Sequence, residues 1–203
     1  MMEERIIEEA KAYIQGLFRN NSDGHGADHS LRVFQNAWMI AKSYPECDLH
    51  IVLLSALLHD VDDHKLFKTE NNQNARAFLK SQNMKDDTID RICNVINGVS
   101  FSKNRDKHLE TLEGKIVQDA DRLDAIGAIG IARTFAFGGK NGRSIEASVQ
   151  HFHDKLLLLK DAMNTEEARN MAEARHACMV QFLSQLDQEL NCPVSGNGHS
   201  VDD

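Results

Sequence analysis

The stretch from Leu53 to His64 constrains this chain most strongly. It reads Leu-Leu-Ser-Ala-Leu-Leu-His-Asp-Val-Asp-Asp-His, so a nearly unbroken apolar run ends at side chains that bind cations or move protons. An apolar run of this length, in a chain with few helix breakers, predicts the interior of a buried helix. Burying one unpaired polar group costs of order 2–7 kcal/mol, and a bound metal ion beside His59 and Asp60 would offset that cost. The stretch therefore predicts a buried helix that ends at a metal site.

The rest of the composition favours helices. Only two prolines occur among 203 residues, and no alternating strand pattern extends beyond a few residues. This length suits a single domain with a sizeable core. We therefore predict an all-α bundle of about eight helices over residues 1–191. The Gly-, Ser-, Asn- and Asp-rich segment 192–203 is predicted to be a disordered tail.

Apolar residues at helical spacing locate the elements. The predicted helices span about 3–18, 28–43, 48–59, 69–81, 86–98, 144–163 and 165–190, and another begins near residue 112 and leads into the stretch 119–127. Their N-terminal caps are predicted at Asp48, Thr69, Ser144 and Thr165. The glycine-rich segment 138–143 is predicted to be a loop, and its order of residues does not match a P-loop.

Charge and targeting signals exclude several classes of function. The net charge is −8 and no dense Lys/Arg run occurs, which disfavours duplex nucleic acid as the main partner. No apolar run reaches the length of a membrane span, and the N-terminus has no signal-peptide pattern. The four cysteines form no CxxC element. We predict a soluble, cytoplasmic monomer or homodimer that does not bind membranes.

Two more stretches carry acids or histidines at the ends of apolar runs. His29 falls in the first turn of a predicted helix, where a lone histidine is more often a cap or a surface residue than a ligand. Asp121 and Asp124 are three residues apart and therefore share a helix face. Aspartate is a poor helix former and is rarely buried without a partner. Either of these two acids is a candidate ligand.

The order of these elements resembles the HD-domain metal-dependent phosphohydrolases. His29 with Ser-Leu-Arg-Val after it, Leu57–Asp60, and Ala120–Ala125 match the three family elements in order. The nearest branch is the small bacterial one described as nucleotide phosphohydrolases, including nucleoside-triphosphate pyrophosphohydrolases. The resemblance implies one divalent ion (Mn, Fe, Ni, Co, Zn or Mg) held by His29, His59, Asp60 and Asp121.

The resemblance also implies roles for neighbouring residues. Asp63 would orient the attacking water and act with Asp60 in catalysis, while Asp62 is the less favoured candidate, its alternative being a solvated loop acid. Asp121 is preferred as the ligand because a basic residue follows it, which leaves Asp124 to orient a histidine or an arginine.

A small phosphorylated substrate, most simply a nucleotide, needs cationic partners. The candidate substrate-binding residues are His25, Arg32, Lys65, Arg122 and Arg133. His25 would donate to a phosphate or protonate the leaving group, and its alternative is a surface loop histidine. Within this class we expect nucleoside triphosphates to be cut to monophosphate and pyrophosphate.

Two functions from other classes remain open. A di-metal oxygenase on a related helical scaffold would need further ligands and two metal ions per chain. A non-catalytic regulatory module would keep the metal for stability and show no turnover that depends on Asp63.

Overall fold

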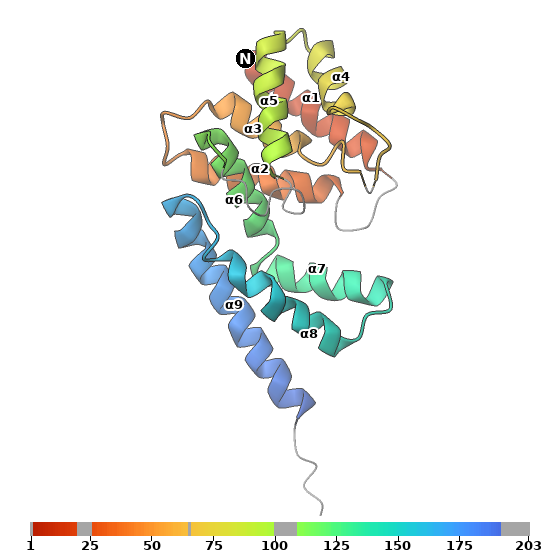
Figure 1. Cartoon of the computed structure of the whole chain (residues 1–203), viewed down its shortest axis with the longest axis vertical. Helices are drawn as coiled ribbons and strands as arrows, with labels where there is room; N and C mark the ends of the chain where they lie inside the picture. Colours follow the sequence, from red (N-terminus) through yellow and green to blue (C-terminus); the bar gives the residue numbers. More distant parts are fainter. Residues whose placement is uncertain (1, 20–25, 65, 100–108, 192–203) are drawn as a thin grey trace, which may run out of the picture.

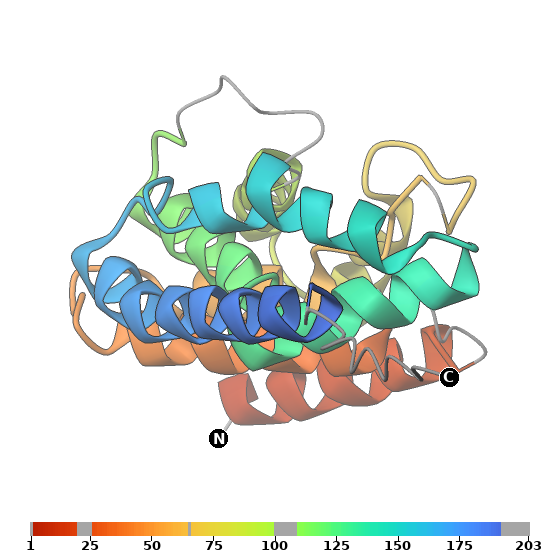
Figure 2. The same ribbon diagram turned by 90° about the horizontal axis from the view of Figure 1, so that it is seen from below.

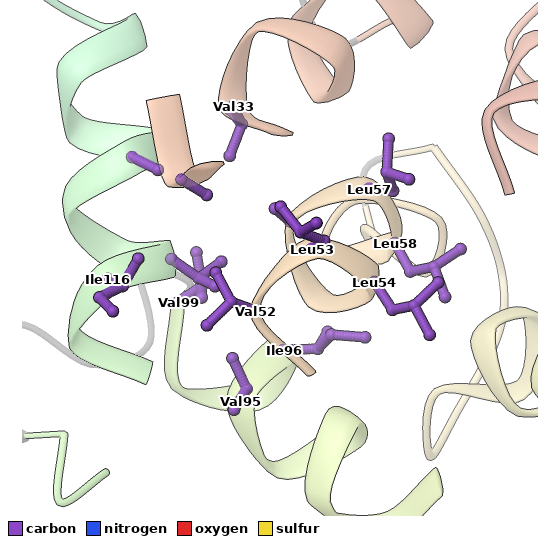
Figure 3. Packing of buried hydrophobic residues seen from close by; sticks show 14 of the residues in the cluster. Val33, Val52, Leu53, Leu54, Leu57, Leu58, Val95, Ile96, Val99 and Ile116 are labelled. Atoms are coloured by element: carbon purple, nitrogen blue, oxygen red, sulfur yellow. The ribbon is translucent and has the colours of Figure 1, made fainter. Parts of the chain in front are cut away.

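One helix, α3 (Leu49–Leu58), is buried over most of its length and lies at the centre of the computed structural model. Its eight residues from Ile51 to Leu58 are all buried, so α3 has no polar face. The side chain of Asp48 caps the helix and accepts the backbone N–H of Ile51 at 3.3 Å. Figure 3 shows side chains of α3 such as Val52 and Leu54 surrounded by apolar residues of neighbouring helices. The apolar run is therefore a helix interior, as its sequence predicts.

The structure describes residues 2–19, 26–64, 66–99 and 109–191. In these ranges it contains no strand, and the all-α prediction is confirmed. The other α-helices are α1 (Met2–Leu17), α2 (Ala27–Ala41), α4 (Gln73–Ser81), α5 (Asp86–Val99), α6 (Leu112–Asp124), α7 (Gly127–Lys140), α8 (Ile145–Asp154) and α9 (Glu166–Leu190). A short 3₁₀ helix, η1 (Leu156–Leu159), follows α8.

The helices form two groups that α6 connects. Figure 1 shows α1 to α5 gathered at one end of the molecule and α7, α8 and α9 at the other, with α6 between them. Helix α2 packs against both α3 and α6, and α7 packs against α9. Figure 2, turned by 90°, shows the same pairing of α7 with α9. This packing brings the start of α2, the end of α3 and the end of α6 close together.

Two predicted boundaries are wrong. Helix α4 begins at Gln73 rather than at Thr69, because Asn71 and Asn72 take left-handed backbone angles (φ 53° and 55°) that a helix cannot contain. Helix α8 ends at Asp154 instead of near residue 163, and η1 replaces its predicted last turns. The caps at Ser144 and Thr165 are confirmed, since each side chain accepts a first-turn N–H of its helix.

The glycine-rich segment is partly helical. Residues 138–140 form the last turn of α7, whereas the sequence predicts a loop there. A Cβ atom at Gly138 would lie 2.7 Å from the Ser148 Oγ of α8, so a larger residue there would force the Ser148 side chain to move. The helix thus forms because tertiary packing overrides the low helix propensity of glycine.

No helix in the described ranges is long and apolar enough to span a membrane. The predicted tail, residues 192–203, lies outside the described residues. The domain boundary at residue 191 therefore stays a prediction.

Candidate metal centre

Four side chains from three helices converge on one point. His29 lies in the first turn of α2, His59 and Asp60 follow the last residue of α3, and Asp121 lies in the last turn of α6. The Nε2 atoms of His29 and His59 are 3.2 Å apart, and Asp121 Oδ1 lies 3.3 Å and 3.9 Å from them. Each Nε2 atom also lies 3.5 Å from an oxygen of the Asp60 carboxylate. Residues far apart in the chain thus present two imidazoles and two carboxylates to the same small volume.

Hydrogen bonds on the far side of each ring fix the two imidazoles. His59 Nδ1 lies 2.9 Å from the carbonyl oxygen of Ala56, and His29 Nδ1 lies 2.6 Å from Asp124 Oδ2. Both partners are acceptors, so each Nδ1 donates a proton and each Nε2 faces the shared point. Two Nε2 lone pairs this close would repel each other unless a proton or a metal ion lies between them.

The donor atoms fit a divalent transition metal. Ligand atoms of His29, His59 and Asp121 all lie within 4.8 Å of one another. Imidazole and carboxylate groups together suit first-row divalent ions, and metal-binding histidines commonly donate their second N–H to a carboxylate or a backbone carbonyl. Both features are present here, so this set of residues can hold such an ion.

The carboxylates also concentrate negative charge at His29. Burial disfavours the charged imidazole, but Asp121, Asp124 and Asp60 raise the pKa of His29 to about 9. Burial likewise opposes ionisation of Asp121 and Asp124, yet their contacts with His29 lower the pKa of both acids. The carboxylates therefore stabilise the protonated, positively charged form of His29 when no metal ion is bound.

Asp124 is the buried centre of a second layer of contacts. Its carboxylate accepts hydrogen bonds from Arg32 Nε at 2.6 Å and Nη2 at 3.1 Å, and from Arg133 Nη1 at 2.6 Å. The Asp124 carboxylate thus contacts one histidine, His29, and two arginines. Of the two acids that the sequence leaves open, Asp121 is the one beside both Nε2 atoms, and Asp124 lies behind the imidazole of His29.

Arg122 does not join this cluster, and its predicted role in phosphate binding stays a prediction. Its guanidinium donates to the carbonyl oxygen of Ala162 and lies 3.9 Å from Asp119. One residue along a helix rotates a side chain by about 100°, so Arg122 leaves α6 in a different direction from Asp121. It shares a face with Asp119 instead, because the two are three residues apart.

Of the remaining predicted site residues, the structure describes Asp63 but not His25 or Lys65. Asp63 lies in the turn after Asp60, with its side chain 15 % exposed and Oδ1 3.4 Å from His64 Nδ1. His25 and Lys65 lie outside the described residues. Their roles, like that of Asp63, stay predictions.

Two acids have partners that the sequence pattern does not indicate. Asp62 accepts the backbone N–H groups of Asn74 and Ala75, so it is not a solvated loop acid. Asp119 is fully buried and accepts four hydrogen bonds from Asn164 and Thr165. Its only signal in the sequence is its position inside an otherwise apolar stretch.

Comparisons with known proteins agree with this geometry. The HD domain model matches residues 26–126, which contain all four converging side chains. The chain is 39% identical over 199 residues to YpgQ of Bacillus subtilis, which covers 94% of this chain and 96% of YpgQ. The crystal structure of YpgQ in complex with ADP has a TM-score of 0.80 at 35% identity, covering 93% of this chain and 97% of that one. An HD-superfamily hydrolase from Bacillus thuringiensis has a TM-score of 0.79 at 34% identity, covering 94% and 100%. The chain belongs to the HD-domain family.

Proposed function

We propose that this protein is a divalent-metal-dependent phosphohydrolase that acts on a nucleotide. The observation that carries the proposal is the convergence of four side chains: His29, His59, Asp60 and Asp121. Hydrogen bonds to Asp124 and to the Ala56 carbonyl fix the Nδ1 atoms of the two histidines. The ADP complex of YpgQ supports a nucleotide as the substrate class. Within that class we favour nucleoside triphosphates, cut to monophosphate and pyrophosphate.

The four converging residues would hold the ion. When bound, a divalent ion lowers the pKa of a water molecule and polarises a phosphoryl group. Asp124 and the Ala56 carbonyl keep the two imidazoles in the required orientation by accepting their Nδ1 protons.

We assign the proton transfer to Asp63. Its carboxylate would orient the attacking water and take up its proton, a role that its place three residues after Asp60 supports. General-base catalysis of this kind contributes typically 10²–10⁴-fold.

Phosphate oxygens would be neutralised by arginines beside the ion. The side chains of Arg32 and Arg133 are 31 % and 24 % exposed, so each is anchored on Asp124 while part of it remains accessible. Guanidinium groups fixed in this way suit bidentate phosphate contacts. His25 and Lys65 complete the proposed set.

A panel of nucleotides, phosphodiesters and phosphomonoesters tests the proposal, assayed with Mn²⁺, Co²⁺, Ni²⁺ and Mg²⁺. We expect nucleoside triphosphates to give pyrophosphate rather than orthophosphate, with one metal ion bound per chain. Asp63→Asn should lower kcat by about 100-fold or more with the metal still bound. Asp87→Asn, which changes an exposed acid in the first turn of α5, should leave kcat unchanged.

Two results would contradict the proposal. Two metal ions per chain would favour a di-metal oxygenase. Absence of turnover with every substrate and metal would favour a regulatory module that keeps its metal for stability.

A further inference from the structure

Helix α4 receives its N-terminal cap from a distant residue. Its own N-cap residue, Asn72, has a left-handed backbone and makes no capping hydrogen bond with its side chain. The N–H groups of Asn74 and Ala75 donate instead to Asp62 Oδ1 and Oδ2, at 2.9 Å and 3.0 Å. These second and third positions of a helix are the donors that an ordinary N-cap side chain satisfies. Asp62 thus replaces the local cap from the other end of the α3–α4 connection.

The contact is reciprocal. The side chain of Asn74 donates through Nδ2 to the backbone carbonyl of Val61, at 2.7 Å. Three hydrogen bonds therefore join residues 61–62 to the first turn of α4. The negative carboxylate of Asp62 also lies at the positive end of the helix dipole, which strengthens the attachment.

Helix α4 also contacts helix α1, so it can serve as a fixed support for residues 61–62. Tyr13 of α1 stacks on Phe78 of α4 with their ring centroids 4.8 Å apart. The Tyr13 hydroxyl also donates to the Asn74 carbonyl at 3.4 Å. Residues 61–62 are thus attached to an element that is packed against the N-terminal helix.

The attached residues lie between the two proposed catalytic acids. The turn is tight, since Val61 N–H donates to the Leu58 carbonyl and Asp63 N–H donates to the Asp60 carbonyl. In such a turn the backbone position of residue 62 constrains the directions of both Asp60 and Asp63. Small shifts of this turn would matter, because a misplacement of a catalytic group by about 1 Å can lower the rate by about 10²-fold.

We propose that Asp62 is a positioning residue, whose contact with α4 fixes the turn that presents Asp60 to the metal and Asp63 to the attacking water. The proposal rests on the proposed phosphohydrolase function. It gives the three acids of the stretch separate tasks: Asp60 faces the imidazoles, Asp63 acts on water, and Asp62 holds the backbone between them.

The test compares Asp62→Ala and Asp62→Asn with Ser144→Ala. Ser144 caps α8 by accepting the Ala147 N–H at 3.1 Å, so Ser144→Ala also removes a helix cap, in a helix that contributes no residue to the cluster. Mn²⁺ affinity is measured by calorimetry, kcat and KM by pyrophosphate release, and backbone protection by hydrogen exchange. Asparagine keeps one acceptor oxygen and therefore serves as the conservative variant.

We expect Asp62→Ala to lower Mn²⁺ affinity or kcat by about 10–100-fold. KM should change less than twofold, and the amides of Asn74 and Ala75 should exchange faster. Asp62→Asn should recover part of the loss, and Ser144→Ala should match the wild type in metal affinity and turnover.

Two outcomes overturn the proposal. If exchange at Asn74 and Ala75 accelerates while metal affinity and kcat stay at wild-type values, Asp62 only caps α4. If Ser144→Ala loses as much as Asp62→Ala, general destabilisation explains both. Should the wild type hydrolyse no nucleotide, the function fails separately, and the metal titration alone decides the role of Asp62.

Discussion

The protonation state of His29 determines when this site can bind a metal ion. Asp121, Asp124 and Asp60 raise the pKa of His29 to about 9 against the effect of burial, so near pH 7 the metal-free ring carries a proton. A metal ion must displace that proton, and its affinity should rise about tenfold per pH unit between pH 6 and 8 before levelling off near pH 9. Calorimetry in buffers with different ionisation heats should detect the release of one proton per ion bound.

The same titration predicts how the metal-free protein responds to pH. The pKa of His29 is higher in the folded chain than its ordinary value, so the charged ring stabilises the fold fully below that ordinary value. This contribution is lost as the pH rises through about 9. The melting temperature of chelated protein should therefore fall between pH 7 and 9.5, while that of Mn²⁺-loaded protein should not. Equal pH profiles for both forms would contradict this account.

Individual residues differ in how well the sequence predicts them. His29, His59 and Asp121 are placed together because each ends an apolar run, and the fold confirms their convergence. Arg122 lies apart from the cluster, on the Asp119 face of α6, and helix geometry alone predicts its separation from Asp121. The role of Asp62 is harder to predict, because its partners are backbone N–H groups of α4, which no side-chain pattern in the sequence indicates.

The element that links the two groups of helices is α6, and Asp119 fixes its contact with α9. Asp119→Ala would leave the N–H groups of Asn164 and Thr165 without their acceptor in a mostly buried site. We expect it to lower the free energy of unfolding by about 3 kcal/mol. Urea denaturation measures this loss, and Mn²⁺ affinity should remain near the wild-type value because Asp119 points away from the cluster.

The matched control is Asp161→Ala, which removes an exposed acid from the same connecting segment. It should change the free energy of unfolding by less than about 0.5 kcal/mol. A similar loss in both variants would show that the hydrogen bonds of Asp119 contribute little.

At the level of elements, amphipathic spacing predicts eight of the nine α-helices in the described ranges, and α7 is missed. The start of α4 is misplaced because Asn71 and Asn72 turn the chain after Thr69, and Asp62, outside the helix, accepts the first-turn N–H groups. Gly138, in the last turn of α7, lies where α8 approaches at short distance. Both features depend on tertiary contacts, which one sequence does not reveal.

Considered as a whole, the molecule builds its site from three helices that the bundle already holds together. The matched HD region supplies all four converging side chains. Arg133 of α7 and Arg175 of α9 support them, because their guanidinium groups donate to backbone carbonyls at the end of α6. Because α3 is buried over eight residues, the fold should persist without metal. A bound ion would therefore add stability to a preformed site.

This coupling predicts a metal-dependent melting temperature. Mn²⁺ at 100 times its dissociation constant should stabilise the fold by about 2.7 kcal/mol, which corresponds to about 5–10 °C for a chain of this length. His59→Ala should abolish the shift, while His153→Ala, which removes an exposed histidine of α8, should preserve it. Differential scanning fluorimetry with and without a chelator measures both. A shift that survives in His59→Ala would mean that Mn²⁺ stabilises the fold from another site, and the convergence of α2, α3 and α6 would then need a different explanation.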